Sequence, residues 1–164
     1  MNIENFLTYN PIQFQIISHI LVLGFAAQAA GFVYFFATMR DVSPRYRIAS
    51  VLGSIVMVSA FLLLYAQSQS WQNTFIFQDG LFVRGEGIFS NGFRYLNWLI
   101  DVPLLLLQLV IILGLTRSES RRLGTLFVGS GAAMIILGYI GQFYETTSLT
   151  NLWIWGGVST VFYL

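Results

Sequence analysis

The chain has 164 residues, of which 56% are hydrophobic and only 9% are charged, and its formal net charge is +1. Soluble domains have about a quarter charged residues, so this composition excludes an ordinary water-soluble protein. The mean hydropathy of +0.71 supports the same conclusion. With no cysteine and one histidine, the chain forms no disulfide and has too few ligands for a protein-only metal site. We expect an integral membrane protein in contact with lipid, without a nucleic-acid partner.

Four stretches of the chain are long enough to cross a membrane, which takes about 20 apolar residues. They cover roughly residues 13–39, 48–67, 93–116 and 123–144. The polar sequences RDVSPRYR and TRSESRR, after the first and third stretches, are typical of loops. A fifth apolar stretch runs from about residue 149 to the last residue and is too short for a full span. We therefore predict one transmembrane domain over residues 1–164, with the fifth helix incomplete.

The charges between these stretches predict an orientation, because short cytoplasmic loops collect arginine and lysine. Two connections each have an excess of two positive charges, the first with Arg40, Asp41, Arg45 and Arg47 and the third with Arg117, Glu119, Arg121 and Arg122. Each group on the opposite side has one net negative charge, namely Glu4, then Asp79 with Arg84 and Glu86, then Glu145. The pattern predicts a multi-pass protein with its N-terminus outside the cell.

The sequence TFIFQDGLFVRGEGIF lies between the second and third predicted helices. Aromatic and β-branched residues flank Asp79 and Gly80, a residue pair that favours a tight turn. The sequence predicts a short β-hairpin at the outer end of the helices.

Polar residues interrupt the third apolar stretch, RYLNWLIDVPLLLLQ, in a regular pattern. At 100° per residue, Arg94, Asn97, Asp101 and Gln108 fall within about 60° of one helix face. The stripe covers about 21 Å of depth at 1.5 Å per residue. A charge facing lipid costs about 3 kcal/mol or more, so this face predicts an ion or proton path, although a polar seam between helices remains the alternative. Pro103 removes a backbone hydrogen bond and should bend the helix.

The motif R-Y-x-x-W-x-x-x-x-P-L-L-L in this stretch resembles the third helix of microbial rhodopsins. The stretches SHIL, VMVSAFLLLYAQ and GYIGQFYE extend the resemblance to helices one, two and four. The resemblance implies a seven-helix, all-α rhodopsin bundle in the bacterial inner membrane, of which this chain supplies helices one to five. In this family, all-trans-retinal is held on a lysine of the last helix.

The set Asn97, Asp101 and Gln108 resembles the signature of the light-driven sodium pumps. Proton-pumping members have a carboxylate at the position of Asn97, and chloride-pumping members have a hydroxyl residue at the position of Asp101. The resemblance makes Asp101 the counterion and proton acceptor of the retinal Schiff base, a buried cation that needs a nearby carboxylate. Asn97 is then a transient Na⁺ ligand through its oxygen. Gln108 lines the inner half of the path.

Further roles follow from the same resemblance. Arg94 matches the outer gate, and Ser59 matches a serine that hydrogen-bonds the counterion, although a serine in a helix can also bond to its own backbone. Five positions match the retinal pocket, where plain helix packing is the alternative: Trp98, Leu105, Met134, Gly138 and Ser159. Gly156 stands where many members have a tryptophan beside the retinal, so we expect a side opening for a carotenoid antenna.

Other matches lie outside the retinal pocket. Glu4 and Glu145 match carboxylates on the ion-release side, with a solvated surface charge as the alternative reading. His19 matches a contact between protomers, and the family resemblance implies a homo-oligomer, specifically a pentamer. Ser50 and Gly53 depart from the Asn and Ser that sodium-pumping members often carry, which leaves the choice between Na⁺ and Li⁺ open.

The chain contains no lysine, because all eight basic residues are arginine. The retinal anchor must then lie in a remainder of the protein or on a separate chain, unless the product is truncated and inactive. Three functions stay open: a light-driven outward sodium pump, a proton-pumping or sensory rhodopsin, and a retinal-free, truncated helical membrane protein. None of them is an enzyme. The polar set of the third helix favours the first, and the missing lysine argues for the last.

Overall fold

The long apolar stretches form helices, which satisfy every backbone polar group without water. The computed structural model describes residues 8–87, 89–90, 92–145 and 147–163. In this part the helices are α1 (Pro11–Thr38), α2 (Arg47–Thr74), α3 (Gly92–Ile112), α4 (Arg117–Gln142) and α5 (Leu149–Val161), with a 3-10 turn at Pro44–Tyr46. The strands are β1 (Thr8–Tyr9), β2 (Phe75–Gln78) and β3 (Leu81–Arg84).

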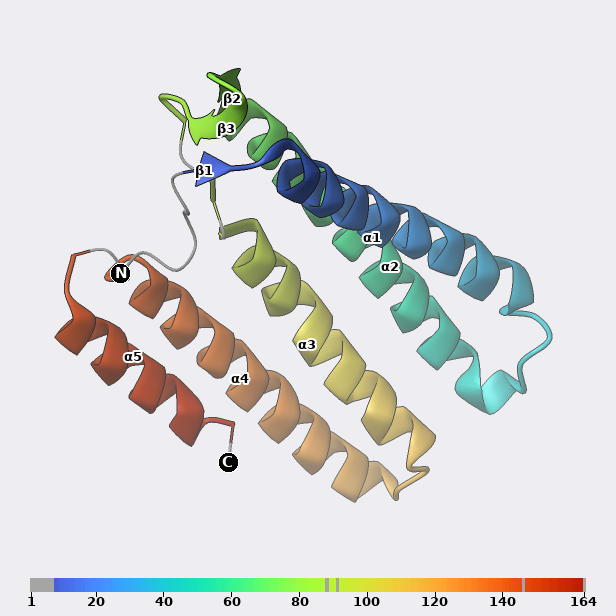
Figure 1. The fold of residues 1–164 in the computed structure, drawn as a ribbon. Coiled ribbons are helices and arrows are strands. Elements are labelled where there is room, and N and C mark those ends of the chain that lie inside the picture. Colours follow the sequence, from blue (N-terminus) through green and yellow to red (C-terminus); the bar gives the residue numbers. More distant parts are fainter. Residues whose placement is uncertain (1–7, 88, 91, 146, 164) are drawn as a thin grey trace.

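The helices lie side by side in chain order, each against the next (Figure 1). Four of them, α1 to α4, are long and apolar enough to cross a membrane. Their outward faces expose large apolar side chains, among them Ile20, Val33, Leu62 and Leu126. Such surfaces are stable in lipid and not in water. For the described residues, the predicted arrangement of four apolar spans followed by a shorter fifth helix is confirmed.

The boundary of α4 differs from the prediction. The charged sequence TRSESRR was expected to be a loop, with the helix starting near residue 123, but α4 begins at Arg117. Thr116 and Glu119 form a capping box, in which the Glu119 backbone N–H donates to Thr116 Oγ1 and the Thr116 N–H donates to Glu119 Oε2. This reciprocal pair satisfies donors that the first helical turn leaves free. The arginines of this sequence therefore lie on the helix itself.

The boundary of α2 also differs, because the helix continues to Thr74 instead of ending near residue 67. The last part of the helix is polar and lies beyond the predicted apolar stretch. However, Gln67, Ser68, Trp71 and Thr74 are all buried, at helical spacing on one face. Tertiary packing thus continues the helix through a polar sequence.

A long-range hydrogen bond joins the connection after α1 to the connection after α3. Helix α3 ends at Ile112, and Gly114 then adopts the left-handed conformation with a φ of +63°. The Arg45 guanidinium donates to the Gly114 carbonyl oxygen at 3.1 Å. The connection after α1 and the connection after α3 are thereby held against each other.

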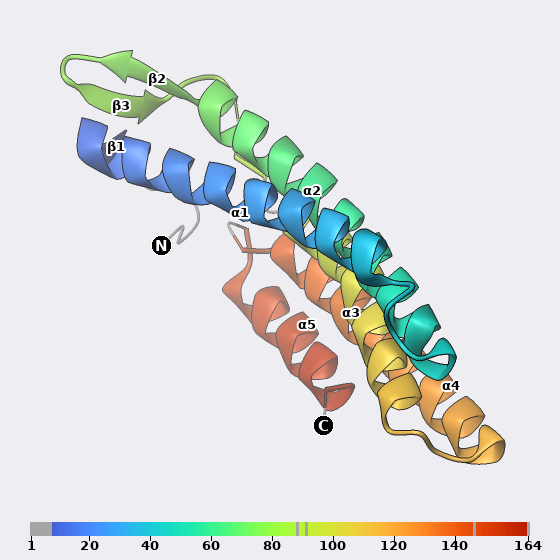
Figure 2. The same ribbon diagram turned by 90° about the vertical axis from the view of Figure 1, so that its right-hand side faces the viewer.

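The predicted β-hairpin is present, and it extends past the C-terminal end of α2 and lies beside the first turns of α1 (Figure 2). Asp79 and Gly80 form its turn with φ values of +51° and +83°, as the predicted turn requires. The pairing of β1 with β3 was not predicted, and it makes a three-stranded antiparallel sheet. A strand of two residues carries no sequence pattern that would identify it.

An aromatic cluster fastens this sheet to the helices. Tyr9, Trp71 and Phe75 are buried, and Phe14 stacks on Phe82 with 3.8 Å between ring centroids. The Trp71 indole N–H also donates to Ser18 Oγ on α1, at 3.1 Å. The cluster therefore joins α1, α2 and the sheet at the outer end.

We predict that Trp71→Ala destabilises the protein strongly. The substitution removes a side chain that is only 2% exposed, together with its hydrogen bond, so the free energy of unfolding should fall by about 3–5 kcal/mol. Unfolding in dodecyl maltoside by added SDS, followed by circular dichroism, measures this change. Trp153→Ala is the matched control, because Trp153 is 72% exposed on α5. Equal shifts for the two variants would contradict the proposed role of the cluster.

Candidate functional site

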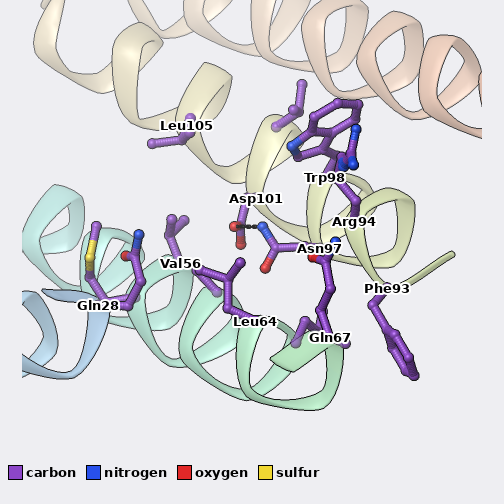
Figure 3. A pocket seen from close by; sticks show the side chains of 14 residues that line it. Gln28, Val56, Leu64, Gln67, Phe93, Arg94, Asn97, Trp98, Asp101 and Leu105 are labelled. Atoms are coloured by element: carbon purple, nitrogen blue, oxygen red, sulfur yellow. Dashed lines mark hydrogen bonds between the residues drawn. The ribbon is translucent and has the colours of Figure 1, made fainter. Parts of the chain in front are cut away.

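A pocket of about 460 Å³ lies between α1, α2 and α3 (Figure 3). Most of its wall is apolar, with side chains such as Val56 and Leu64 from α2. The polar side chains that line it are Gln28, Gln67, Arg94, Asn97 and Asp101. The arrangement therefore combines an apolar cavity with a single carboxylate, that of Asp101.

Asn97 and Asp101 form the centre of the pocket. Four residues apart on α3, they lie one above the other on the same helix face. The Asn97 amide Nδ2 donates to Asp101 Oδ2 at 2.5 Å, and Asp101 is only 6% exposed. The amide oxygen of Asn97, Oδ1, and the other carboxylate oxygen of Asp101, Oδ1, are buried without a hydrogen-bond partner among the described residues. Two oxygen acceptors are thus available for a cation or a proton.

Ser59 on α2 is buried, and its hydroxyl lies beside the Asp101 carboxyl group. Its Oγ makes no hydrogen bond with the described residues. The alternative reading, a bond to its own helix, is what Ser54 does, with its hydroxyl 3.0 Å from the Ser50 carbonyl oxygen. Ser59 has no such bond, so its hydroxyl is free to donate to Asp101.

Gln108 lies on the same stripe but outside this pocket. Its side-chain Nε2 donates to the Ala49 carbonyl oxygen of α2 at 3.1 Å. The amide therefore holds two helices together, which is the alternative considered for the whole stripe. Pro103 does not interrupt α3, which continues as one helix to Ile112.

Arg94, Trp98 and Leu105 line the same pocket as Asp101. The Arg94 guanidinium lies 6.0 Å from the centre of the Trp98 ring, within the range of a cation–π contact. Trp98 is 40% and Leu105 is 47% exposed, so α1, α2 and α3 enclose them only on one side.

A second pocket of about 530 Å³ lies between α3, α4 and α5, and it shares Val102 with the first. Met134 lines it, and the Ser159 hydroxyl donates to the Met134 carbonyl oxygen at 2.7 Å. A methyl group on Gly138 would lie 3.3 Å from the Tyr95 ring and 3.6 Å from Ser159 Oγ. Met134, Gly138 and Ser159, predicted separately, therefore lie together at the contact of α4 with α5.

The remaining predicted residues lie away from these pockets. A side chain on Gly156 would meet nothing within 4 Å, so the α5 surface is open there. His19 is exposed on α1, and Glu145 is half-buried just after α4. Glu4 lies outside the described residues.

Two polar residues of the pocket were missed. Gln28 on α1 has a buried Oε1 without a hydrogen-bond partner among the described residues, and Gln67 on α2 is only 7% exposed. Their signal is an amide inside an apolar helix, in FAAQAAG and LLYAQSQ. No polar stripe marks them in the sequence, whereas α3 has a repeated polar pattern.

The chain is similar to known retinal proteins over most of its length. The model of the bacteriorhodopsin-like protein family matches residues 15–164. A green-light absorbing proteorhodopsin from Gamma-proteobacterium EBAC31A08 is 26% identical over 117 residues, which cover 71% of this chain and 42% of that protein.

Solved structures agree with this similarity. Xanthorhodopsin, described as a light-driven ion pump with dual chromophore, superposes with a TM-score of 0.89 and 30% identity, over 96% of this chain and 64% of that one. A thermophilic rhodopsin gives a TM-score of 0.90 and 30% identity, over 97% and 62% of the two chains. The chain thus spans less than two thirds of the length of these relatives.

We predict that Gln108→Leu lowers stability modestly, because it removes the hydrogen bond between α3 and α2. Hydrogen bonds between membrane helices contribute about 0.6 kcal/mol on average and up to about 1.7 kcal/mol. The same SDS titration measures the effect. Gln69→Leu serves as the control, since Gln69 is exposed on α2. If both variants unfold at the wild-type midpoint, Gln108 does not join the helices.

Proposed function

Because the chain belongs to the bacteriorhodopsin-like family, we propose that it forms the first five helices of a light-driven pump that exports Na⁺. It is a multi-pass membrane protein with the rhodopsin fold. The proposal depends on one observation above all. The paired Asn97 and Asp101 side chains each keep a buried oxygen without a partner among the described residues.

The residues of the two pockets fit retinal. A long apolar chromophore suits the apolar walls, and the buried Asp101 carboxylate requires a cation beside it to be stable at this depth. When bound through a Schiff base, retinal would supply that cation together with a light-driven change of shape. Trp98, Leu105 and Met134 would contact its polyene. The sequence has no lysine, so we propose that the anchoring lysine lies outside these 164 residues.

The polar residues of α3 have different roles in the proposed transport. Asp101 holds a proton at Oδ1 after illumination, which removes one negative charge from the pocket. Asn97 then offers its carbonyl oxygen to Na⁺, a hard cation that prefers oxygen ligands, and as an amide it does not compete for the proton. Ser59 steadies the Asp101 carboxyl group. Gln108 is also an amide, so it cannot return a proton from the inner side.

The outer half of the path belongs to the same proposal. Arg94 and Trp98 would close the pocket toward the outside, where Glu145 and Glu4 receive the released ion. This assignment depends on the predicted orientation, with the N-terminus outside the bacterial inner membrane. We also propose a homo-oligomer, a pentamer by family resemblance, with the exposed His19 at the contact between protomers.

Transport of another small cation is the second candidate. Ser50 is buried at the inner end of α2, and Gly53 packs against the Phe35 ring, since a methyl group on Gly53 would lie 3.4 Å from the nearest ring atom. Small residues at this point would pass Li⁺ as well as Na⁺. A proton pump or a light sensor would use the same Asp101 without a need for Asn97.

We predict light-driven Na⁺ export by cells that express the complete reading frame and are supplied with retinal. In NaCl, illumination should make the medium alkaline, and a protonophore should enhance this change because protons enter passively to balance the exported Na⁺. The change should vanish in KCl, and LiCl tests the smaller cation. A pH electrode records it. Abolition by the protonophore would instead indicate a proton pump, and failure to form a coloured pigment would exclude retinal binding.

The variant Asn97→Asp tests the residue on which the proposal depends. A second carboxylate beside Asp101 competes for the proton and should lower the Na⁺-dependent signal by about tenfold, equivalent to about 1.4 kcal/mol in the transport barrier. Asn73→Asp is the matched control, because Asn73 is exposed at the outer end of α2. Unchanged Na⁺ export in Asn97→Asp would rule out the role given to Asn97.

We also propose that the open surface at Gly156 admits a carotenoid antenna. The xanthorhodopsin relative is described as having a dual chromophore, and here a side chain at Gly156 meets nothing within 4 Å. Excitation of a hydroxylated carotenoid should then transfer energy to retinal, as seen in the fluorescence excitation spectrum. Gly156→Trp should abolish the transfer and preserve the pigment. If no transfer occurs with the wild-type protein, the antenna proposal is wrong.

A further inference from the structure

A groove of about 630 Å³ runs along the contact between α3 and α4 at their inner ends. Its wall is mostly apolar or small, with Leu107 and Ile111 from α3 and Gly129 from α4. Two charged side chains, Arg117 and Arg121, line one end of it. The groove is thus an apolar channel with a cationic mouth.

Two glycines of α4, Gly124 and Gly129, leave the space that forms the groove. A methyl group on Gly124 would lie 3.6 Å from Leu107 Cδ1, so this glycine lets α3 approach closely. A methyl group on Gly129 would meet nothing within 4 Å. The space beside Gly129 is therefore open for an occupant from outside the helix pair.

The groove opens on the face of α4 that is directed away from α5. Gly141 packs on α5, where a methyl group on it would lie 3.1 Å from Trp155 Cβ, and Met134 accepts the hydrogen bond from Ser159. Thr125, which lines the groove, is nine residues before Met134 and so lies about 180° around the helix from it. The groove shares no lining residue with the pocket around Asp101. Its occupant is therefore a component of the surrounding membrane.

No acidic side chain lines the cationic mouth among the described residues. Arg117 and Arg121 are exposed, and they are four residues apart, which places them one turn apart on the same face. Glu119, the nearest acidic residue in the sequence, is engaged by Thr116, whose Oγ1 lies 2.6 Å from Glu119 Oε2. Neither guanidinium forms an ion pair within the described part of the chain. Two parallel cations at a membrane surface attract an anionic head group.

We infer that this groove binds an anionic phospholipid. Its phosphate is held between Arg117 and Arg121, and one acyl chain lies along the groove past Gly129. Twelve residues of helix from Arg117 to Gly129 rise about 18 Å, close to the roughly 15 Å of one leaflet of the hydrocarbon core. Guanidinium groups suit this ligand because they bind phosphate oxygens in pairs. The inference does not depend on the proposed pump activity.

Native mass spectrometry of the chain tests this inference. The protein is released from dodecyl maltoside micelles containing palmitoyl-oleoyl phosphatidylglycerol or the corresponding phosphatidylcholine. We expect one phosphatidylglycerol to be retained at least about tenfold more than phosphatidylcholine, because two arginines attract the anionic head group. Glycerol 3-phosphate should not displace the lipid, because it lacks the acyl chain.

Three variants separate the head-group and chain contacts. Arg117→Gln with Arg121→Gln should remove the preference for phosphatidylglycerol. Gly129→Leu should reduce retention of both lipids without a change of charge, because the leucine side chain fills the groove. Arg122→Gln is the matched control, since Arg122 is exposed and does not line the groove. Circular dichroism checks the helix content of each variant, and the single arginine variants replace the double one if it does not fold.

Equal retention of the two lipids by the wild-type protein would overturn the inference. An effect of Arg122→Gln as large as that of the double variant would also overturn it, since attraction would then follow total charge and not the groove. Full retention by Gly129→Leu would show that the acyl chain lies elsewhere and would equally overturn it.

Discussion

The burial of one carboxylate in an apolar bundle is the constraint on which the rest of the pocket depends. In water Asp101 would be solvated, whereas here it is 6% exposed and its ionised form is stable only with donors and a cation nearby. Two neighbouring residues bring hydrogen-bond donors to this carboxylate. Asn97 donates a hydrogen bond from the next turn of the same helix, and Ser59 brings a hydroxyl from α2. The apolar wall around them keeps these interactions free of competing water.

The polar stripe of α3 serves two purposes at different depths. Near the middle of the helix, Asn97 and Asp101 face a pocket. Two turns further in, Gln108 uses its amide to hold α2. A polar pocket and a helix contact therefore occupy different parts of the same stripe. The division has a physical basis, since a carboxylate needs a cavity or a cation, whereas an amide is satisfied by one backbone carbonyl.

Sequence periodicity predicted the parts of this fold that follow from hydrophobicity. The apolar stretches became helices, and the Asp79–Gly80 turn became a hairpin. The ends of α2 and α4 were not predicted, because polar residues occur both in loops and in terminal helical turns. A capping box at Thr116 starts α4 early, and the burial of Trp71 extends α2. The two missed amides, Gln28 and Gln67, follow no repeated polar pattern in their helices, and only the packing of three helices shows that they line the same pocket as Asp101. Family resemblance supplied the assignments of Met134, Gly138 and Ser159, for which spacing alone indicates nothing beyond packing.

The β1–β3 pairing imposes an order on assembly. Every helix contacts its neighbour in the sequence, so each helix pair can form as soon as its second member is inserted. Strand β1 is different, because Thr8 pairs with Val83, and α1 and α2 separate them along the chain. Among the described residues, the first segment to be synthesised therefore reaches its final position only after two helices have crossed the membrane and the hairpin has formed. The three-stranded sheet is therefore completed late, because β1 can pair only after β3 has formed.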